Sequence, residues 1–198
     1  MEQKVVRTKK TKTAEQALQS LMRECARSER SSGDALRLMK RWGLSDEDAA
    51  KVLLRLQTER FIDDSRYAEA FVRDKLNLSG WGAYKIKMAL RTKGVSKEII
   101  EEVVAPMLAE TDMTERLEEI MRRRMRTLKY SSPYDAKTKL IRFAASRGYE
   151  IDEAVECASK IVNEYKKIYE ESLFGSCYAA CYIYHSHTNL CAGVVEGE

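Results

Sequence analysis

Residues 86–107 read IKMALRTKGVSKEIIEEVVAPM, and this stretch decides the fold class of the chain. After Gly94, apolar side chains recur at helical spacing, at Ile100, Val103, Val104 and Met107. That spacing places them on one face of an α-helix, whereas a half-buried strand would alternate apolar and polar residues. Before the glycine, apolar residues follow the same spacing at Ile86, Ala89 and Leu90. The stretch therefore predicts two amphipathic helices that are joined at a glycine.

The same pattern occurs twice more, around Gly43 and Gly148, which lie 51 residues before and 54 residues after Gly94. Counting forward from each glycine, four positions are apolar in all three copies: Ala49/Ile100/Ala154, Val52/Val103/Cys157, Leu53/Val104/Ala158 and Leu56/Met107/Ile161. Counting backward, three more positions are apolar: Ala35/Ile86/Leu140, Leu38/Ala89/Phe143 and Met39/Leu90/Ala144. Recurrence at a fixed period is typical of repeat proteins.

A third helix recurs upstream in each copy, with apolar triplets at Leu18/Ala68/Leu117, Leu21/Phe71/Ile120 and Met22/Val72/Met121. We therefore predict an all-α fold of three tandem three-helix repeats. The expected organisation is a basic N-terminal arm, three repeats and an irregular C-terminal tail, at residues 1–13, 14–61, 62–110, 111–169 and 170–198. Because one three-helix unit has a small core, neighbouring units are expected to share buried surface.

Local signals agree with these helices. Ser45 and Ser96 follow two of the glycines and suit N-cap positions, where a hydroxyl accepts a hydrogen bond from a free backbone amide. The pair Asp63-Asp64 suits the same role, and its charge complements the helix dipole. A metal or acid–base role for this pair is the alternative. Each glycine of the pattern suits the left-handed position just after a helix.

The charge of the chain points to an anionic partner or a solvated surface. The formal net charge is +4, but residues 170–198 hold four acidic residues and no lysine or arginine, so residues 1–169 carry +8. Such a surface attracts phosphate backbones or acidic protein faces. The odd number of cysteines, five, favours reduced thiols, and no secretory signal or long apolar run is present. We therefore expect a cytoplasmic protein that does not cross a membrane.

Several linked segments resemble the RecX family. The central one is Phe61-Ile62-Asp63-Asp64-Ser65-Arg66-Tyr67-Ala68-Glu69-Ala70-Phe71-Val72-Arg73, followed by Gly80-Trp81-Gly82 and Lys93-Gly94-Val95. Residues 30–44 resemble the first repeat of that family, and residues 139–149 resemble the third. The resemblance covers residues 14–165. One departure is Trp81, which lies between two glycines where many members carry a basic residue before a single glycine.

The resemblance implies a function as well as a fold. Members of the RecX family are elongated, curved arrays of three-helix repeats without a catalytic centre or cofactor. They modulate the RecA recombinase, commonly by binding the filament that RecA forms on single-stranded DNA. The expected partners are therefore the RecA filament and single-stranded DNA, bound directly or through the filament, by a protein expected to be a monomer and an inhibitor. A general nucleic-acid-binding helical protein and a repeat scaffold for another protein are the alternatives.

Basic residues of the second and third repeats are the candidate contacts, because each phosphate that they neutralise releases counterions and strengthens binding. The alternative for each is a solvated surface charge. The twelve candidates are Arg66, Arg73, Lys75, Lys85, Lys87, Arg91, Lys93, Arg122, Arg123, Arg124, Arg126 and Lys129.

Other side chains favour structural roles. Tyr67 and Phe71 are spaced as a core pair, with base stacking as the alternative, and Trp42 and Trp81 are expected to pack within or between repeats more than to anchor a partner. The body contains no histidine and no recognisable nucleophile motif, so we expect no enzyme activity. In the tail, residue types that bind zinc occur at an unfamiliar spacing, and we predict no metal there: Cys177, Cys181, His185, His187 and Cys191.

Overall fold

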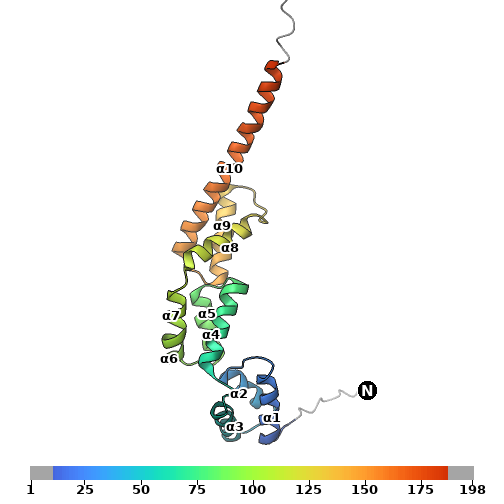
Figure 1. The fold of residues 1–198 in the computed structure, drawn as a ribbon, viewed down its shortest axis with the longest axis vertical. Coiled ribbons are helices and arrows are strands. Elements are labelled where there is room, and N and C mark those ends of the chain that lie inside the picture. Colours follow the sequence, from blue (N-terminus) through green and yellow to red (C-terminus); the bar gives the residue numbers. More distant parts are fainter. Residues whose placement is uncertain (1–10, 187–198) are drawn as a thin grey trace, which may run out of the picture.

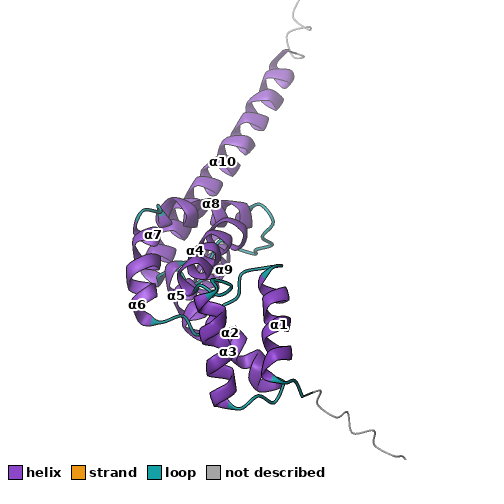
Figure 2. Cartoon of the chain, turned by 60° about the horizontal axis from the view of Figure 1, so that its bottom comes forward, coloured by secondary structure: helices purple, strands orange, loops and turns teal. Residues whose placement is uncertain are grey.

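The computed structural model describes the backbone of residues 11–186 and the side chains of residues 11–168. Within this range the chain forms helices joined by short loops and contains no strand (Figure 2). The predicted all-α repeat architecture is confirmed. The units stack end to end into an elongated molecule, with the last helix projecting from one end (Figure 1).

Each unit consists of a first, a second and a third helix, as the repeated apolar pattern predicted. The first unit is α1 (Ala14–Cys25), α2 (Ser32–Arg41) and α3 (Asp46–Thr58). In the second unit, α4 (Asp64–Asp74) continues into a π-helical turn, η1 (Lys75–Ser79), and is followed by α5 (Ala83–Thr92). The third helix of that unit is α6 (Lys97–Ile99), η2 (Ile100–Val104) and α7 (Ala105–Ala109). The third unit is α8 (Met113–Met125), α9 (Pro133–Arg147) and α10 (Ile151–Ser186).

The predicted helix ends are present. The hydroxyls of Ser45 and Ser96 accept hydrogen bonds from backbone amides in the first turn of α3 and α6, and Asp63 does so at α4. Gly43, Gly94 and Gly148 all have φ between 80° and 84°. This left-handed conformation strains residues with a Cβ, which explains the glycine at each of these helix ends.

The apolar cores of the three units remain separate clusters. The fully buried side chains at their centres are Leu21, Met39 and Leu56 in the first unit, Ile86, Leu90 and Val104 in the second, and Leu117, Met121 and Leu140 in the third. Met113 packs against both the second and the third cluster. Tyr67 is buried in the second core with Phe71 partly buried beside it, as predicted, and Trp81 packs edge-on against Phe71 at 6.2 Å.

The units are joined by close backbone contacts at glycines. A Cβ added to Gly33 would lie 2.3 Å from the carbonyl oxygen of Lys93, and a Cβ added to Gly82 would lie 2.3 Å from that of Gly148. Hydrogen bonds close the two joints: the Ser31 hydroxyl donates to Lys93 O at 2.7 Å, and the Gly82 amide donates to Arg147 O at 2.8 Å. At both joints, the start of the second helix of one unit therefore contacts the end of the second helix of the next unit.

The prediction of an irregular tail from residue 170 is wrong for the part that the structure describes, because α10 continues to Ser186. Residues 151–186 contain no proline and one glycine, Gly175, so no strong helix breaker interrupts the helix. The side chains of the cysteines and histidines considered for zinc lie outside the described residues.

Candidate nucleic-acid interface

Three of the twelve candidate residues are engaged in ion pairs that hold helices or units together. Arg66 Nε lies 2.7 Å from Glu29 of the first unit, and Lys93 Nζ lies 3.0 Å from Asp34. Arg122 pairs with Glu118 on its own helix at 2.8 Å and with Glu164 on α10 at 3.3 Å. These three cations have a structural role whether or not a partner also contacts them.

Ion pairs and hydrogen bonds around Asp34 hold the joint between the first and second units. Burial favours the protonated form of Asp34, but hydrogen bonds from Arg37 and Lys93 outweigh that effect and lower the pKa of its carboxyl group. Arg37 also donates to the carbonyl oxygen of Thr92, at 2.9 Å. One carboxylate from the first unit thus organises cations on both sides of the joint.

Four further candidates form weaker intramolecular contacts, which are either exposed ion pairs or cation–π contacts. Arg73 and Arg123 form exposed i,i+4 pairs with glutamates, and such pairs contribute little to stability. Lys75 and Lys85 lie over the ring of Trp81, at 5.3 and 4.6 Å from its centroid. Lys85 also donates to Ser146 O across the second joint. Trp81 itself packs against the core of the second unit, which is one of the two packing roles predicted for it.

The other five candidates form no ion pair within residues 11–168. Arg91 makes only a weak contact with the sulfur of Met88, and Lys87 is half-buried. The remaining three are exposed on the third unit, at Arg124, Arg126 and Lys129.

A groove on the third unit brings basic residues together. One part, a cavity of about 450 Å³, lies between η1, α8 and α9. A second part, of about 600 Å³, continues over the faces of α8 and α9. The two parts share Arg124, Thr127 and Phe143, and we call them together the third-unit groove. Its cationic lining residues are Arg116, Arg123, Arg124, Lys129, Lys139, Arg142 and Arg147.

Phe143 lies at the centre of this groove, half-buried, with two guanidinium groups against its ring. Arg147 lies 5.1 Å and Arg124 lies 6.0 Å from the ring centroid, within the range of cation–π attraction. The only acidic lining residue is Glu119, which is paired with Arg123 at 2.6 Å. The groove therefore holds a large excess of positive charge around an aromatic side chain.

The basic residues of the groove differ in whether their donors are already engaged within the chain. Arg116 and Arg147 fix the π-helical turn: Arg116 donates to Leu76 O and Asn77 Oδ1, and Arg147 donates to Ser79 O. Lys139 is tied to Asp135 and to the carbonyl oxygen of Lys129. Arg124 and Arg142 have no such partner in the described part of the chain, so their donors are free for a ligand.

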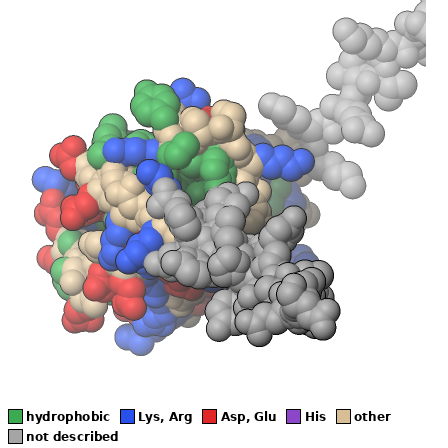
Figure 3. All heavy atoms as spheres, turned by 90° about the horizontal axis from the view of Figure 1, so that it is seen from above, with side chains coloured by type: hydrophobic (Ala, Val, Ile, Leu, Met, Phe, Trp, Pro, Cys, Tyr) green, Lys and Arg blue, Asp and Glu red, His purple; other side chains and the backbone are tan. Residues whose placement is uncertain are grey.

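Sequence reasoning placed Arg123, Arg124 and Lys129 among the candidate contacts but missed Arg116, Lys139, Arg142 and Arg147. The last three lie in the stretch of residues 139–149 that carried the resemblance to a known family. Seen from the end that carries α10, basic and apolar side chains are interspersed on one side, whereas acidic side chains, mixed with basic ones, lie along the left and lower margin (Figure 3).

Neither a metal site nor a membrane-spanning helix is found among the described residues. These residues contain no group of histidine, cysteine and carboxylate side chains that could hold a metal ion. They also contain no helix that is long and apolar enough to cross a membrane.

Comparison with known proteins identifies the family. The family model for the second three-helix domain of RecX matches residues 63–104, and that for the third matches residues 110–157. A Regulatory protein RecX from Clostridium botulinum (strain Alaska E43 / Type E3) is 32% identical over 154 residues, which cover 77% of this chain and 69% of the relative. The chain belongs to the RecX family.

Further RecX proteins agree with this assignment. The Regulatory protein RecX of Mycolicibacterium vanbaalenii is 32% identical over 145 residues, covering 70% of this chain and 78% of the relative. The crystal structure of RecX from Lactobacillus salivarius superposes with a TM-score of 0.61 at 17% identity, over 75% of this chain and 96% of that one. The latter likeness shows the shared RecX fold. Since RecX proteins are regulators of RecA, the family gives this chain that general role.

Proposed function

We propose that this chain inhibits RecA by binding the filament of RecA on single-stranded DNA, and that the third-unit groove contacts the phosphate backbone of the strand. In this proposal the protein acts in the cytoplasm as a monomer, without catalysing a reaction. The general role follows from the family, and the proposed mode of binding rests on the groove.

The observation that carries the proposal is the set of free cations beside Phe143. Arg124 and Arg142 line the groove without an acidic partner among the described residues, and Arg124 lies 6.0 Å from the centroid of the Phe143 ring. A single strand offers phosphates that cations neutralise and unpaired bases that stack on aromatic rings. A duplex keeps its bases stacked internally, so a half-buried aromatic ring on the wall of the groove favours the single strand.

The test replaces these two arginines. Arg124→Gln with Arg142→Gln removes two positive charges and leaves the ion pairs between helices intact. The control, Lys51→Gln with Arg55→Gln, removes the same charge from α3, whose side chains at these positions are exposed. Binding to RecA-coated single-stranded DNA is measured over a range of salt concentrations.

We expect the groove variant to bind more weakly and its salt dependence to fall by about 1.4 in the slope of log K against log salt, since each single-strand phosphate contact contributes about 0.7. The control is expected to keep the slope of the unsubstituted protein. Equal slopes for the two variants would refute the groove as the contact. Equal binding of naked and RecA-coated strands by the unsubstituted protein would instead indicate a general nucleic-acid-binding protein.

A further inference from the structure

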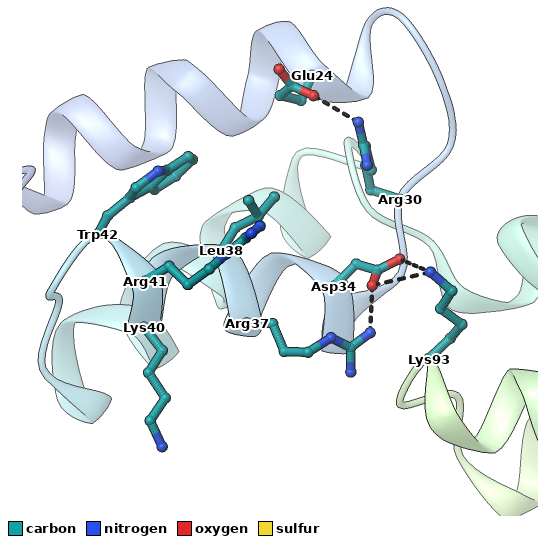
Figure 4. Close-up of a pocket in the computed structure, with 9 residues that line it drawn as sticks. All are labelled: Glu24, Arg30, Asp34, Arg37, Leu38, Lys40, Arg41, Trp42 and Lys93. Carbon is teal, nitrogen blue, oxygen red and sulfur yellow. Dashed lines mark hydrogen bonds and ion pairs between the residues drawn. The ribbon is translucent and has the colours of Figure 1, made fainter. Parts of the chain in front are cut away.

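A second basic cleft lies where the first unit meets the second. It has a volume of about 750 Å³ and is bounded by the end of α1, by α2 and by Lys93 of the second unit. Figure 4 shows Trp42 at one end of the cleft, Arg30 and Lys93 at the other, and Leu38 and Arg41 between them. None of the candidate contacts predicted from the sequence, except Lys93, lies here.

The charges that line this cleft do not balance. Its two acidic residues are both engaged, Glu24 with Arg30 at 2.7 Å and Asp34 with Arg37 and Lys93. Asp34 therefore faces two cations with one negative charge. Lys40 and Arg41 are exposed on the lining and have no ion-pair partner in the described chain. The cleft thus keeps three positive charges in excess.

An aromatic side chain accompanies these cations, as in the third-unit groove. Trp42 is half-buried on the wall of the cleft, and Lys12 Nζ lies 3.6 Å from the centroid of its ring. Leu38 adds an apolar surface. A ligand in the cleft would meet free cationic donors beside an aromatic ring.

The repeat relates two positions in the two sites. Gly43 and Gly148 are equivalent and lie 105 residues apart, so Arg37 corresponds to Arg142 and Leu38 to Phe143. In each unit the site runs from the end of the first helix, α1 or α8, along the second helix, α2 or α9. The corresponding residues of the second unit are Met88 and Ala89, which carry no charge. A cation followed by an apolar side chain at these two positions is therefore present in the first and third units and absent from the middle one.

We propose that the cleft between the first and second units is a second binding site for the phosphate backbone of a single DNA strand. This second site rests on the proposed function, because the same strand would also occupy the third-unit groove. An acidic peptide also suits a cationic surface, but the ring of Trp42 beside the unpaired cations Lys40 and Arg41 favours the nucleic acid, whose bases stack on aromatic side chains. Occupation of two sites by one strand makes binding of the second intramolecular and raises the overall affinity.

The experiment measures binding of fluorescent oligothymidylates to three full-length variants. The cleft variant is Lys40→Gln with Arg41→Gln, the groove variant is Arg124→Gln with Arg142→Gln, and the control is Lys51→Gln with Arg55→Gln. One oligothymidylate has about 8 nucleotides, enough for one site, and the other is several times longer. Quenching of Trp42 by the long strand is followed with Trp81 replaced by phenylalanine, so that Trp42 is the only tryptophan.

We expect the cleft variant to weaken binding of the long strand by about tenfold or more relative to the control, and to lower the salt slope by about 1.4. The loss should be smaller for the short strand, which reaches one site at a time, and Trp42 fluorescence should fall when the long strand binds. Long-strand affinity equal to that of the control, or unchanged Trp42 fluorescence, would overturn the proposal.

Oligoglutamate serves as the probe for an acidic peptide. If it binds the unsubstituted protein and not the cleft variant, while oligothymidylate binds both equally, the cleft is a peptide site and the proposal fails. The two proposals fail separately. A groove variant that behaves like the control refutes the groove, whereas a cleft variant that behaves like the control refutes the second site.

Discussion

Replacing Gly82 by alanine tests whether the glycine contacts hold the units together. Gly82 has φ −79° and ψ 164°, a conformation that alanine adopts without strain. The added Cβ, however, would lie 2.3, 2.6 and 2.8 Å from backbone atoms of Gly148 and Tyr149. Because these neighbours are backbone atoms, no side chain can rotate away, and the second joint must open.

The expected loss of folding free energy follows from the added methyl group and from the hydrogen bond that is lost. Overpacking of one methyl group costs about 1–3 kcal/mol. Opening the joint also removes the hydrogen bond from the Gly82 amide to Arg147 O, for which the net loss is about 0.5–1.5 kcal/mol. Together these give about 2–4 kcal/mol. For a chain of this size, Tm should fall by about 4–16 °C, since each kcal/mol shifts it by about 2–4 °C.

Thermal and urea unfolding followed by circular dichroism measure this effect, with Tyr84→Ala as the control. Tyr84 is 63% exposed on the adjacent helix, so its replacement should change stability by less than about 0.5 kcal/mol. We also expect Gly82→Ala to broaden the transition or divide it, because the third unit then unfolds with less coupling to the second. A Tm within about 1 °C of the unsubstituted protein would refute the reasoning.

Two further substitutions test the first joint. Ser31→Ala removes the N-cap of α2 and also the hydrogen bond to Lys93 O. Loss of the N-cap should lower the free energy of unfolding by about 1 kcal/mol. An unchanged free energy in urea unfolding would contradict the role assigned to Ser31. Asp34→Asn tests the pH dependence. The folded protein lowers the pKa of this carboxyl group, so its stabilising contribution is present above the ordinary pKa of aspartate and is lost as pH falls through the lowered value. The variant should therefore lose less stability than the unsubstituted protein between pH 6 and about pH 2, and parallel stability curves would contradict this.

The repeat architecture was predictable because it depends on local patterns. The apolar spacing around Gly43, Gly94 and Gly148 recurs along the chain, and each helix end is marked by a residue with a specific backbone or capping role. The joints were not predictable. Gly33 and Gly82 gain their role from backbone that lies about one repeat away in sequence, and no local pattern reports that approach.

The candidate site was predictable only in part. A sequence shows where cations are dense, as at Arg122, Arg123 and Arg124, but not which of them already has a carboxylate partner. Folding pairs Arg122 with Glu164 on another helix and leaves Arg124 free. Arg142 was missed because it lies in a helix of ordinary composition and becomes part of a groove only when α9 packs against α8.

The prediction of an irregular tail failed for a different reason. The uncharged composition of residues 173–184 suggested an irregular segment, but helix formation depends on the absence of breakers as well as on charge. The helix that began at Ile151 therefore continued through this segment to Ser186.

The most direct test of the central claim is the ATPase activity and persistence of RecA filaments on single-stranded DNA, titrated with this protein and with the Arg124→Gln, Arg142→Gln variant. Binding to naked strands is measured in parallel. We expect the protein to prefer the RecA-coated strand and to lower RecA activity, and the variant to do so only at distinctly higher concentrations. No preference for the coated strand, together with unchanged RecA activity, would contradict it.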